Sequence, residues 1–191
     1  MDKHREQAIR IARSMLEMEP IFIDTETTGF ESVDTLVEIA ILDTDGTLLY
    51  QSLVNPNKSI PPGASRVHGI TDATVAFSPS WKQVWPEVEP VLKERVAGFY
   101  NAEFDLRLIQ QSCGLIGIPW EYPLADDFCV MELFARYYGT PGRMPGQFRW
   151  QKLAFAGRHF NIPEPNAHRA QDDALLTKLV LEKMAEGNVQ P

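Results

Sequence analysis

The sequence is poor in cysteine and contains no long apolar segment. Cys113 and Cys129 are the only cysteines in 191 residues, too few for a disulfide framework or a cysteine-based zinc cluster. We therefore expect two reduced thiols rather than a structural disulfide. No apolar run reaches the roughly 20 residues of a membrane span. The first residues, MDKHREQAIR, lack the apolar core of a secretory signal. The expectation is a cytoplasmic protein with no membrane partner.

Positive charge is also scarce. Lysine and arginine number 18 against 26 aspartates and glutamates, which gives a formal net charge of −8. This acidic balance argues against a protein that coats nucleic acid by charge alone. It does not argue against an enzyme that acts on nucleic acid, because clustered carboxylates hold divalent cations that supply positive charge locally.

Several widespread catalytic motifs are missing. The sequence contains no G-x-x-x-x-G-K-[ST], no H-E-x-x-H and no G-x-S-x-G. Their absence argues against P-loop nucleotide hydrolases, zinc metalloproteases of the H-E-x-x-H type and α/β-hydrolases.

The patterns that are present fit one α/β domain. With 44% hydrophobic residues, a chain of this length can bury one sizeable core. We expect a helical N-terminal extension over residues 1–19 and a globular domain over residues 20–191. The expected strands cover residues 21–23, 36–42, 47–54, 96–100 and 128–130. The expected helices of the domain cover residues 80–95, 103–112, 132–137, 150–158 and 169–186. Residues 55–71 and 139–150, rich in proline or glycine, are expected to be loops. The order of elements predicts a mixed sheet flanked by helices.

Two acids follow the first predicted strand. Asp24 and Glu26 come directly after the apolar residues 21–23, and alternation along a strand places both carboxylates on one face. Adjacent carboxylates repel each other unless a cation binds them, and their oxygens suit Mg²⁺ or Mn²⁺. Thr27 and Thr28 follow in a turn of small residues where a ligand can approach the backbone. Taken alone, however, D-x-E also fits a solvated strand end.

Two later segments carry further acids. Asp105 lies early in the helix predicted over residues 103–112, with Asn101 as its expected N-cap. On its own, Asp105 fits equally well as an acid that stabilises the helix dipole, worth about 0.3–1 kcal/mol. His168 precedes the last predicted helix, and Asp173 within it leads an apolar run. A charge there is costly unless it is paired or bound to a metal. Asp172 should point about 100° away from Asp173, towards solvent.

Together, these segments resemble one family. FIDTETTG carries Asp24 and Glu26, YNAEFD carries Asp105, and HRAQDDA carries His168 and Asp173. In this order they resemble the motifs of the DEDDh-type, DnaQ-like 3′–5′ exonucleases, which include the proofreading subunit of bacterial DNA polymerase III. A VHGIT segment that recurs in such enzymes is also present. The resemblance covers residues 20–186, nearly the whole chain.

The resemblance implies a ribonuclease-H-like, three-layer fold with a central mixed five-stranded sheet. It also implies two Mg²⁺ or Mn²⁺ ions in the active site. Asp24 would bridge both ions, Glu26 and Asp173 would bind the ion on the nucleophile side, and Asp105 would bind the second. His168 would be the general base, and the products would be nucleoside 5′-monophosphates. One departure concerns substrate contacts only: Tyr100 stands where family members often have histidine.

Substrate contacts are expected at several positions. By resemblance, the backbone near Thr27 binds the terminal 3′-hydroxyl, with Thr28 and Asn101 as further contacts. His68 is either a substrate contact or a structural loop histidine.

Residues 141–170 are basic in an otherwise acidic chain, and four aromatic residues are interleaved among them. We expect a flank that contacts phosphates through residues such as Arg143 and Arg149, with base stacking by the aromatics. The alternative is a solvated loop followed by an amphipathic helix. In either case Trp81 and Trp85 are expected in the core.

Two other functions stay open. The chain could be a nucleic-acid-binding module on the same fold without chemistry, although all four acids and His168 are retained. It could also be a docking subunit of a polymerase or another nucleic-acid-processing complex, using residues 1–19. No obvious polymerase-binding tail follows Glu186 in this sequence, so the expectation is a standalone or accessory nuclease. The motifs do not distinguish DNA from RNA 3′ ends, single from double strands, or proofreading from repair or end-trimming. Homodimerisation is compatible with the resemblance.

Overall fold

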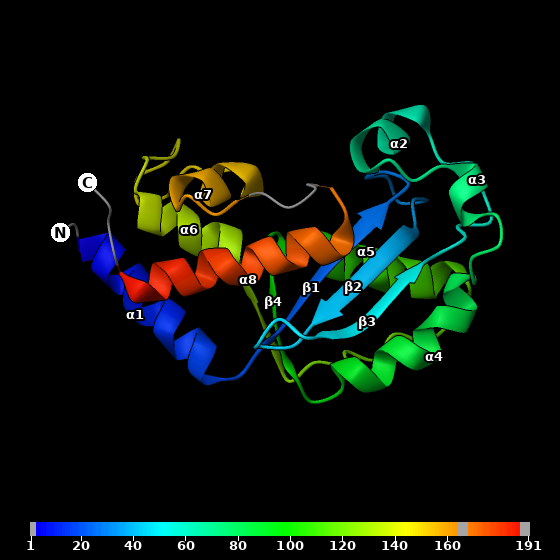
Figure 1. Cartoon of the computed structure of the whole chain (residues 1–191), viewed down its shortest axis with the longest axis horizontal. Helices are drawn as coiled ribbons and strands as arrows, with labels where there is room; N and C mark the ends of the chain where they lie inside the picture. Colours follow the sequence, from blue (N-terminus) through cyan, green and yellow to red (C-terminus); the bar gives the residue numbers. More distant parts are fainter. Residues whose placement is uncertain (1–2, 164–167, 188–191) are drawn as a thin grey trace.

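A five-stranded mixed sheet forms the centre of the molecule (Figure 1). The computed structural model describes residues 3–163 and 168–187. The strand order is β3-β2-β1-β4-β5. The strands are β1 (Ile21–Thr27), β2 (Leu36–Leu42), β3 (Leu48–Leu53), β4 (Val96–Phe99) and β5 (Asp126–Cys129). The first three strands pair antiparallel in sequence order, whereas β1, β4 and β5 run parallel. The predicted mixed, five-stranded α/β fold is therefore confirmed.

Helices cover both faces of this sheet. The helices are α1 (Lys3–Glu17), α2 (Pro62–His68), α3 (Asp72–Val75), α4 (Trp81–Leu92), α5 (Ala102–Leu115), α6 (Val130–Tyr138), α7 (Leu153–His159) and α8 (Ala170–Glu186). Helix α8 crosses one face, with α1, α6 and α7 beside it, while α4 and α5 pack on the other face (Figure 1). None of the helices in residues 3–163 and 168–187 is long and apolar enough to cross a membrane.

The alternation of side chains along β1 divides the core into two layers. Ile21 and Ile23 are buried in the layer with α4 and α5, whereas Phe22 is buried in the layer with α1, α6 and α8. The same alternation continues past the apolar residues. It directs Asp24 and Glu26 towards α8 and leaves the intervening residue on the side of α5.

Helix α1 is part of the helical layer. Its apolar residues Ala8, Ile9 and Ala12 are buried against α6 and α8. Two of its arginines bond to neighbouring elements, since Arg13 donates to the backbone oxygen of Ala185 (2.8 Å) and Arg5 donates to the Tyr137 hydroxyl (2.8 Å).

The prediction of a loop over residues 55–71 was wrong in part, because α2 forms there. Pro62 stands in the first turn of α2. Proline is tolerated there because a backbone N–H at that position would find no acceptor within the helix, so its absence costs no hydrogen bond. Gly69 ends the helix in the left-handed conformation, with φ at 73°. Reading proline as a helix breaker missed its second role as a helix starter.

The short helix α3 was not predicted, and the other differences concern the ends of elements. The strand predicted over residues 128–130 lies at Asp126–Cys129, and Val130 already begins α6. Strand β1 extends beyond the predicted residues 21–23 to Thr27. Trp81 and Trp85 are buried, as predicted. Residues 139–150 contain no helix or strand, only an isolated bridge between Pro141 and Phe148.

We predict that Gly98→Ala destabilises the protein. A Cβ atom at this position of β4 would lie 2.7 Å from the Phe128 ring and 3.0 Å from Phe22. Both rings are buried, so the extra methyl should cost about 1–3 kcal/mol of unfolding free energy. Gly114→Ala in α5 is the control, because nothing lies within 4 Å of its Cβ position. Thermal unfolding should show a lower Tm for the first variant only, and equal Tm values would contradict this packing.

Candidate active site

Three carboxylates meet where β1 ends against the first turn of α8. Oxygens of Asp24, Glu26 and Asp173 all lie within 4.8 Å of one another. The two residues from β1 share a face because of strand alternation, and Asp173 reaches them from the helix across that face. The sequence separates the strand acids from Asp173 by most of the domain, and the fold brings them together.

Asp105 approaches the same place from α5. It is only 4% exposed, and its Oδ1 accepts hydrogen bonds from the backbone nitrogen (3.1 Å) and the hydroxyl (2.7 Å) of Thr25. Thr25 lies between the two acids of β1 but faces α5. One strand therefore carries two acids on one face and fixes a third with the residue between them.

Burial and the charges of neighbouring acids raise the pKa values of Asp24, Glu26 and Asp105. Burial raises the pKa of Asp24 well above its ordinary value, and the charges of Asp105, Asp173 and Glu26 raise it further. Burial, followed by the charges of Asp173 and Glu38, raises the pKa of Glu26 to about 8. Burial raises the pKa of Asp105 to about 7, against the opposing effect of the Thr25 hydrogen bonds.

The chemistry of this donor set fits hard divalent cations. All the ligand atoms that the cluster offers are carboxylate oxygens, which Mg²⁺ and Mn²⁺ prefer. A bound cation would favour the ionised form that burial disfavours. An acidic cluster capable of holding metal is thus present in the described part of the chain.

His168 lies beside the cluster. Its backbone nitrogen donates to Oδ2 of Asp173 at 3.3 Å, its side chain is exposed, and its φ of 73° is left-handed. The structure thus brings all five predicted catalytic residues to one end of the sheet.

The turn after β1 is held by internal hydrogen bonds. The Thr27 hydroxyl donates to the backbone oxygen of Gly29 (2.9 Å), and the Thr28 hydroxyl donates to Oδ1 of Asp34 (2.6 Å). Thr28 is only 1% exposed. Its side chain therefore serves the turn, and a substrate contact at this residue stays a prediction.

His68 supports the same turn from α2. Its Nδ1 accepts from the Ile70 backbone nitrogen (3.0 Å), so Nε2 carries the hydrogen and donates to the backbone oxygen of Thr27 (3.2 Å). Burial lowers the pKa of His68 and favours this neutral form. Both ring nitrogens are engaged within the protein. The structural alternative is thereby favoured, and a direct substrate contact stays a prediction.

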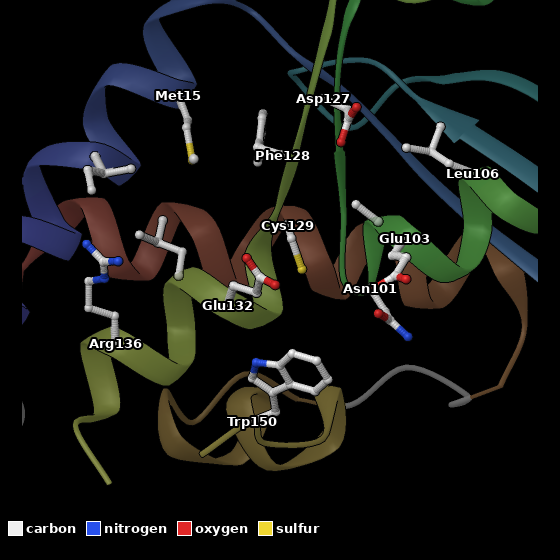
Figure 2. A pocket seen from close by; sticks show the side chains of 13 residues that line it. Met15, Asn101, Glu103, Leu106, Asp127, Phe128, Cys129, Glu132, Arg136 and Trp150 are labelled. Atoms are coloured by element: carbon white, nitrogen blue, oxygen red, sulfur yellow. The ribbon is translucent and has the colours of Figure 1, made fainter. Parts of the chain in front are cut away.

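Asn101 stands at the N-cap position of α5, but its side chain makes no capping hydrogen bond, contrary to expectation. It is exposed and lines a groove of about 510 Å³ between α1, α5, β5 and α6. Figure 2 shows it facing this groove together with Trp150 and Glu132. A polar amide and an exposed indole therefore lie next to the helix that carries Asp105.

Only some of the basic residues in the predicted flank, residues 141–170, are exposed and able to contact phosphates. Arg143 and Arg149 are exposed in the loop between α6 and α7. Arg169 instead forms an ion pair with the buried Glu38 (2.6 Å). Among the interleaved aromatics Trp150 is 58% exposed, whereas Phe155 packs against the core.

Sequence reasoning missed Thr25 and the pair formed by Glu38 and Arg169. A signal existed for Glu38, since it is the single charge in the apolar segment LVEIAIL. A lone charge inside a buried strand requires a partner. Its partner is 131 residues away, so the sequence alone could not identify it.

Comparison with known proteins identifies the family. The exonuclease family RNase_T matches residues 21–181. The chain belongs to the DEDDh-type, DnaQ-like 3′–5′ exonuclease family. An uncharacterized exonuclease, CP81, of Escherichia phage 186 is 39% identical over 181 residues, which span 92% of this chain and 93% of the phage protein. DNA polymerase III subunit epsilon of Treponema pallidum is 29% identical, over 79% of this chain and 69% of its own length.

Solved structures of exonucleases, among them a DEDDh family member, share the fold. Exonuclease X in complex with 5′ overhanging duplex DNA superposes with a TM-score of 0.61 at 28% identity, covering 88% of this chain and 92% of that one. The nuclease domain of 3′hExo, bound to rAMP, has a TM-score of 0.70 at 16% identity, with the same coverage of both chains. The ribonuclease-H-like fold and the assignment as an exonuclease, a hydrolase, are thus confirmed.

In the metal-free protein, Glu26 should make stability fall as pH rises. Its pKa is about 8 in the folded state against an ordinary 4.5, so the folded state binds more protons between these values. The free energy of unfolding then falls across this window. Thermal melts in chelator from pH 5 to 8 should show a steeper loss for the wild type than for Glu26→Gln.

Glu103→Gln is the control for that experiment, because Glu103 is exposed in the first turn of α5. It should reproduce the wild-type slope. Identical slopes for the wild type and Glu26→Gln would contradict the raised pKa. Added Mg²⁺ should reduce the wild-type loss, because a cation stabilises the ionised cluster.

Proposed function

We propose that this exonuclease hydrolyses phosphodiester bonds at the 3′ end of DNA, with RNA as the alternative, and releases nucleoside 5′-monophosphates. The observation that carries the proposal is the convergence of Asp24, Glu26 and Asp173 within 4.8 Å. Asp105 and His168 lie beside them in a chain of an exonuclease family. A binding module without chemistry would have no need of this costly cluster.

The four acids would hold two divalent ions, Mg²⁺ or Mn²⁺. Two such ions, when bound, would neutralise the phosphate charge, lower the pKa of a water and stabilise the leaving oxygen. We assign Asp24 to both ions, Glu26 and Asp173 to the nucleophile side, and Asp105 to the leaving-group side. The fixed Oδ1 of Asp105, bonded twice by Thr25, supports a rigid position for that ligand.

His168 would act as the general base. A neutral imidazole accepts a proton near neutral pH. The oxygen of a water attacks phosphorus, the bond from phosphorus to the 3′-oxygen of the penultimate nucleotide breaks, and His168 takes the water proton. The terminal nucleotide leaves with the 5′-phosphate. The hydrogen bond from the His168 backbone to Asp173 supports this role, because it ties the base to a metal-binding acid.

The turn after β1 would select the 3′ end. We propose that the backbone at Thr27 binds the terminal 3′-hydroxyl. This turn is held by the hydrogen bond from His68 to the Thr27 oxygen and by that from Thr28 to Asp34. His68 and Thr28 would then act on the substrate by fixing this backbone.

The rest of the substrate strand would follow exposed residues near Asn101. Arg143 and Arg149 would contact phosphates, and the exposed Trp150 would stack on a base. DNA is the first choice because the solved relative with 28% identity is a complex with duplex DNA. The epsilon subunit among the relatives makes a polymerase complex the alternative setting to standalone or accessory action.

Removing one acid of the cluster should abolish hydrolysis. For Asp24→Ala and Asp173→Ala, the metal site loses a ligand, and activity with Mg²⁺ or Mn²⁺ should fall below detection while the fold is retained. Asp172→Asn is the matched control, since its carboxylate is not part of the cluster. The assay follows 5′-labelled DNA and RNA, single- and double-stranded, with chelator as the blank. Stepwise shortening indicates 3′–5′ polarity, whereas immediate release of the labelled nucleotide, or cleavage by Asp173→Ala, would contradict the proposal.

His168→Ala should slow the chemical step. The loss of a general base typically costs about 10²–10⁴-fold in rate, so kcat should fall by that factor. The calorimetric affinity for Mn²⁺ should change little, because the imidazole is not assigned to metal. His4→Ala, which removes an exposed histidine from α1, provides the control. A wild-type kcat for His168→Ala would show that another group takes the proton.

A further inference from the structure

Glu38 is a buried acid that belongs to no predicted motif. It is 0% exposed within β2, a strand in which every residue is buried. In the antiparallel pairing of β1 and β2, Glu38 stands directly opposite Glu26. Residues directly opposite each other share a face of the sheet, and like charges there repel. A further carboxylate thus adjoins the catalytic cluster.

All the bonds to the Glu38 carboxylate come from protein donors. Nε of Arg169 donates to Oε2 (3.0 Å), and Nη2 donates to Oε1 (2.6 Å). This two-bond geometry is the strongest that arginine makes with a carboxylate. The backbone nitrogen of Ala170 also donates to Oε2 (3.1 Å), and the Gln51 amide donates to Oε1 (3.3 Å). Both oxygens are therefore engaged, which explains how a buried charge is tolerated at this position.

These bonds fix the start of α8. Arg169 stands at the N-cap position but makes no side-chain cap of its own. Glu38 instead accepts from the backbone nitrogen of Ala170, the first residue of the helix, as a capping acid would. The capping carboxylate belongs to strand β2, and it lies 132 residues before Ala170 in the chain. It therefore sets where the helix begins relative to the sheet as well as stabilising it.

Two catalytic residues flank this attachment point. His168 directly precedes Arg169, and the backbone nitrogen of Asp173 donates to the Arg169 oxygen (3.0 Å) in the first turn of α8. On β2, Glu38 is paired with the strand that carries Asp24 and Glu26. The ion pair thus links the strand paired with β1 to the start of the helix that carries Asp173 and follows His168.

We propose that Glu38 and Arg169 are positioning residues for the exonuclease reaction: their ion pair places Asp173 and His168 against Asp24 and Glu26. It has a second consequence. With both Glu38 oxygens bonded to protein donors, this carboxylate is kept from competing with Glu26 for a cation. This inference rests on the proposed function, because it assigns the ion pair a role in that same site.

Arg169→Met tests the inference with a side chain of similar length and no charge. Displacing catalytic groups by about 1 Å can cost about 10²-fold in rate, so kcat should fall by about 10–100-fold. KM for the oligonucleotide should change by less than about threefold, since the proposed substrate contacts, such as Arg149 and Trp150, are other residues. Arg169→Lys keeps the charge but not the two-bond geometry, and it should recover only part of the loss.

Lys178→Met is the matched control. It removes another ion pair of α8, between the buried Lys178 and Glu182 (2.7 Å), one that lies outside the catalytic residues. It should lower Tm and leave kcat at the wild-type value. If the Glu38–Arg169 pair served stability alone, Arg169→Met would resemble this control, with kcat unchanged in the folded fraction measured by circular dichroism.

The double variant Glu38→Leu with Arg169→Leu tests the inference in a protein that should still fold. Apolar replacement of a whole buried ion pair is often tolerated, whereas removal of one partner is not. This variant should stay folded and remain as slow as Arg169→Met, with weaker Mn²⁺ binding by calorimetry. Folded variants with wild-type kcat and Mn²⁺ affinity would overturn the inference. A wild-type protein that cleaves no substrate would instead overturn the proposed function, and Mn²⁺ affinity would still report on the positioning of Asp173.

Discussion

Electrostatic repulsion between buried and half-buried carboxylates is the constraint on which the rest of this structure depends. Asp24, Glu26 and Asp173 gather within 4.8 Å, and Glu38 stands opposite Glu26 on the next strand. Burial disfavours every one of these charges. The protein meets this constraint in two ways. It neutralises Glu38 with the guanidinium of Arg169, and it leaves the other carboxylates, including Asp24 and Glu26 with their raised pKa values, to be neutralised by cations from solution.

The fold supports both ways of neutralising these carboxylates. Strand β1 places its even-numbered acids towards α8 and uses the intervening Thr25 to fix Asp105 on the side of α5. The helix that delivers Asp173 is attached to β2 by the same ion pair that removes the surplus carboxylate from the site. Catalytic geometry and charge neutralisation therefore rely on shared contacts. Arg169, at the N-terminal end of α8, is accordingly required to assemble the acidic cluster. Its positive charge alone would suggest a role in phosphate binding.

Much of the site could be predicted from the sequence because its acids lie in short local motifs. Asp24 and Glu26 follow an apolar strand, and Asp173 leads an apolar helix segment, so each required a partner for its charge. The sheet and most helices follow from apolar periodicity in the same way. What escaped prediction depends on three-dimensional contact. Helix α2 begins with prolines that also fit a loop, and Arg169 was assigned to a basic flank because its partner lies on a distant strand.

The central claim is that the acids hold protons until divalent ions replace them. Calorimetric titration of Mn²⁺ into chelator-treated protein at pH 7, in buffers with different ionisation enthalpies, measures it directly. With the pKa of Glu26 at about 8 and that of Asp105 at about 7, binding should release protons. We predict two bound ions per chain, with net proton release at pH 7 that decreases as the pH rises through the raised pKa values of these acids. Binding without proton release, or no binding at millimolar Mn²⁺, would contradict the account.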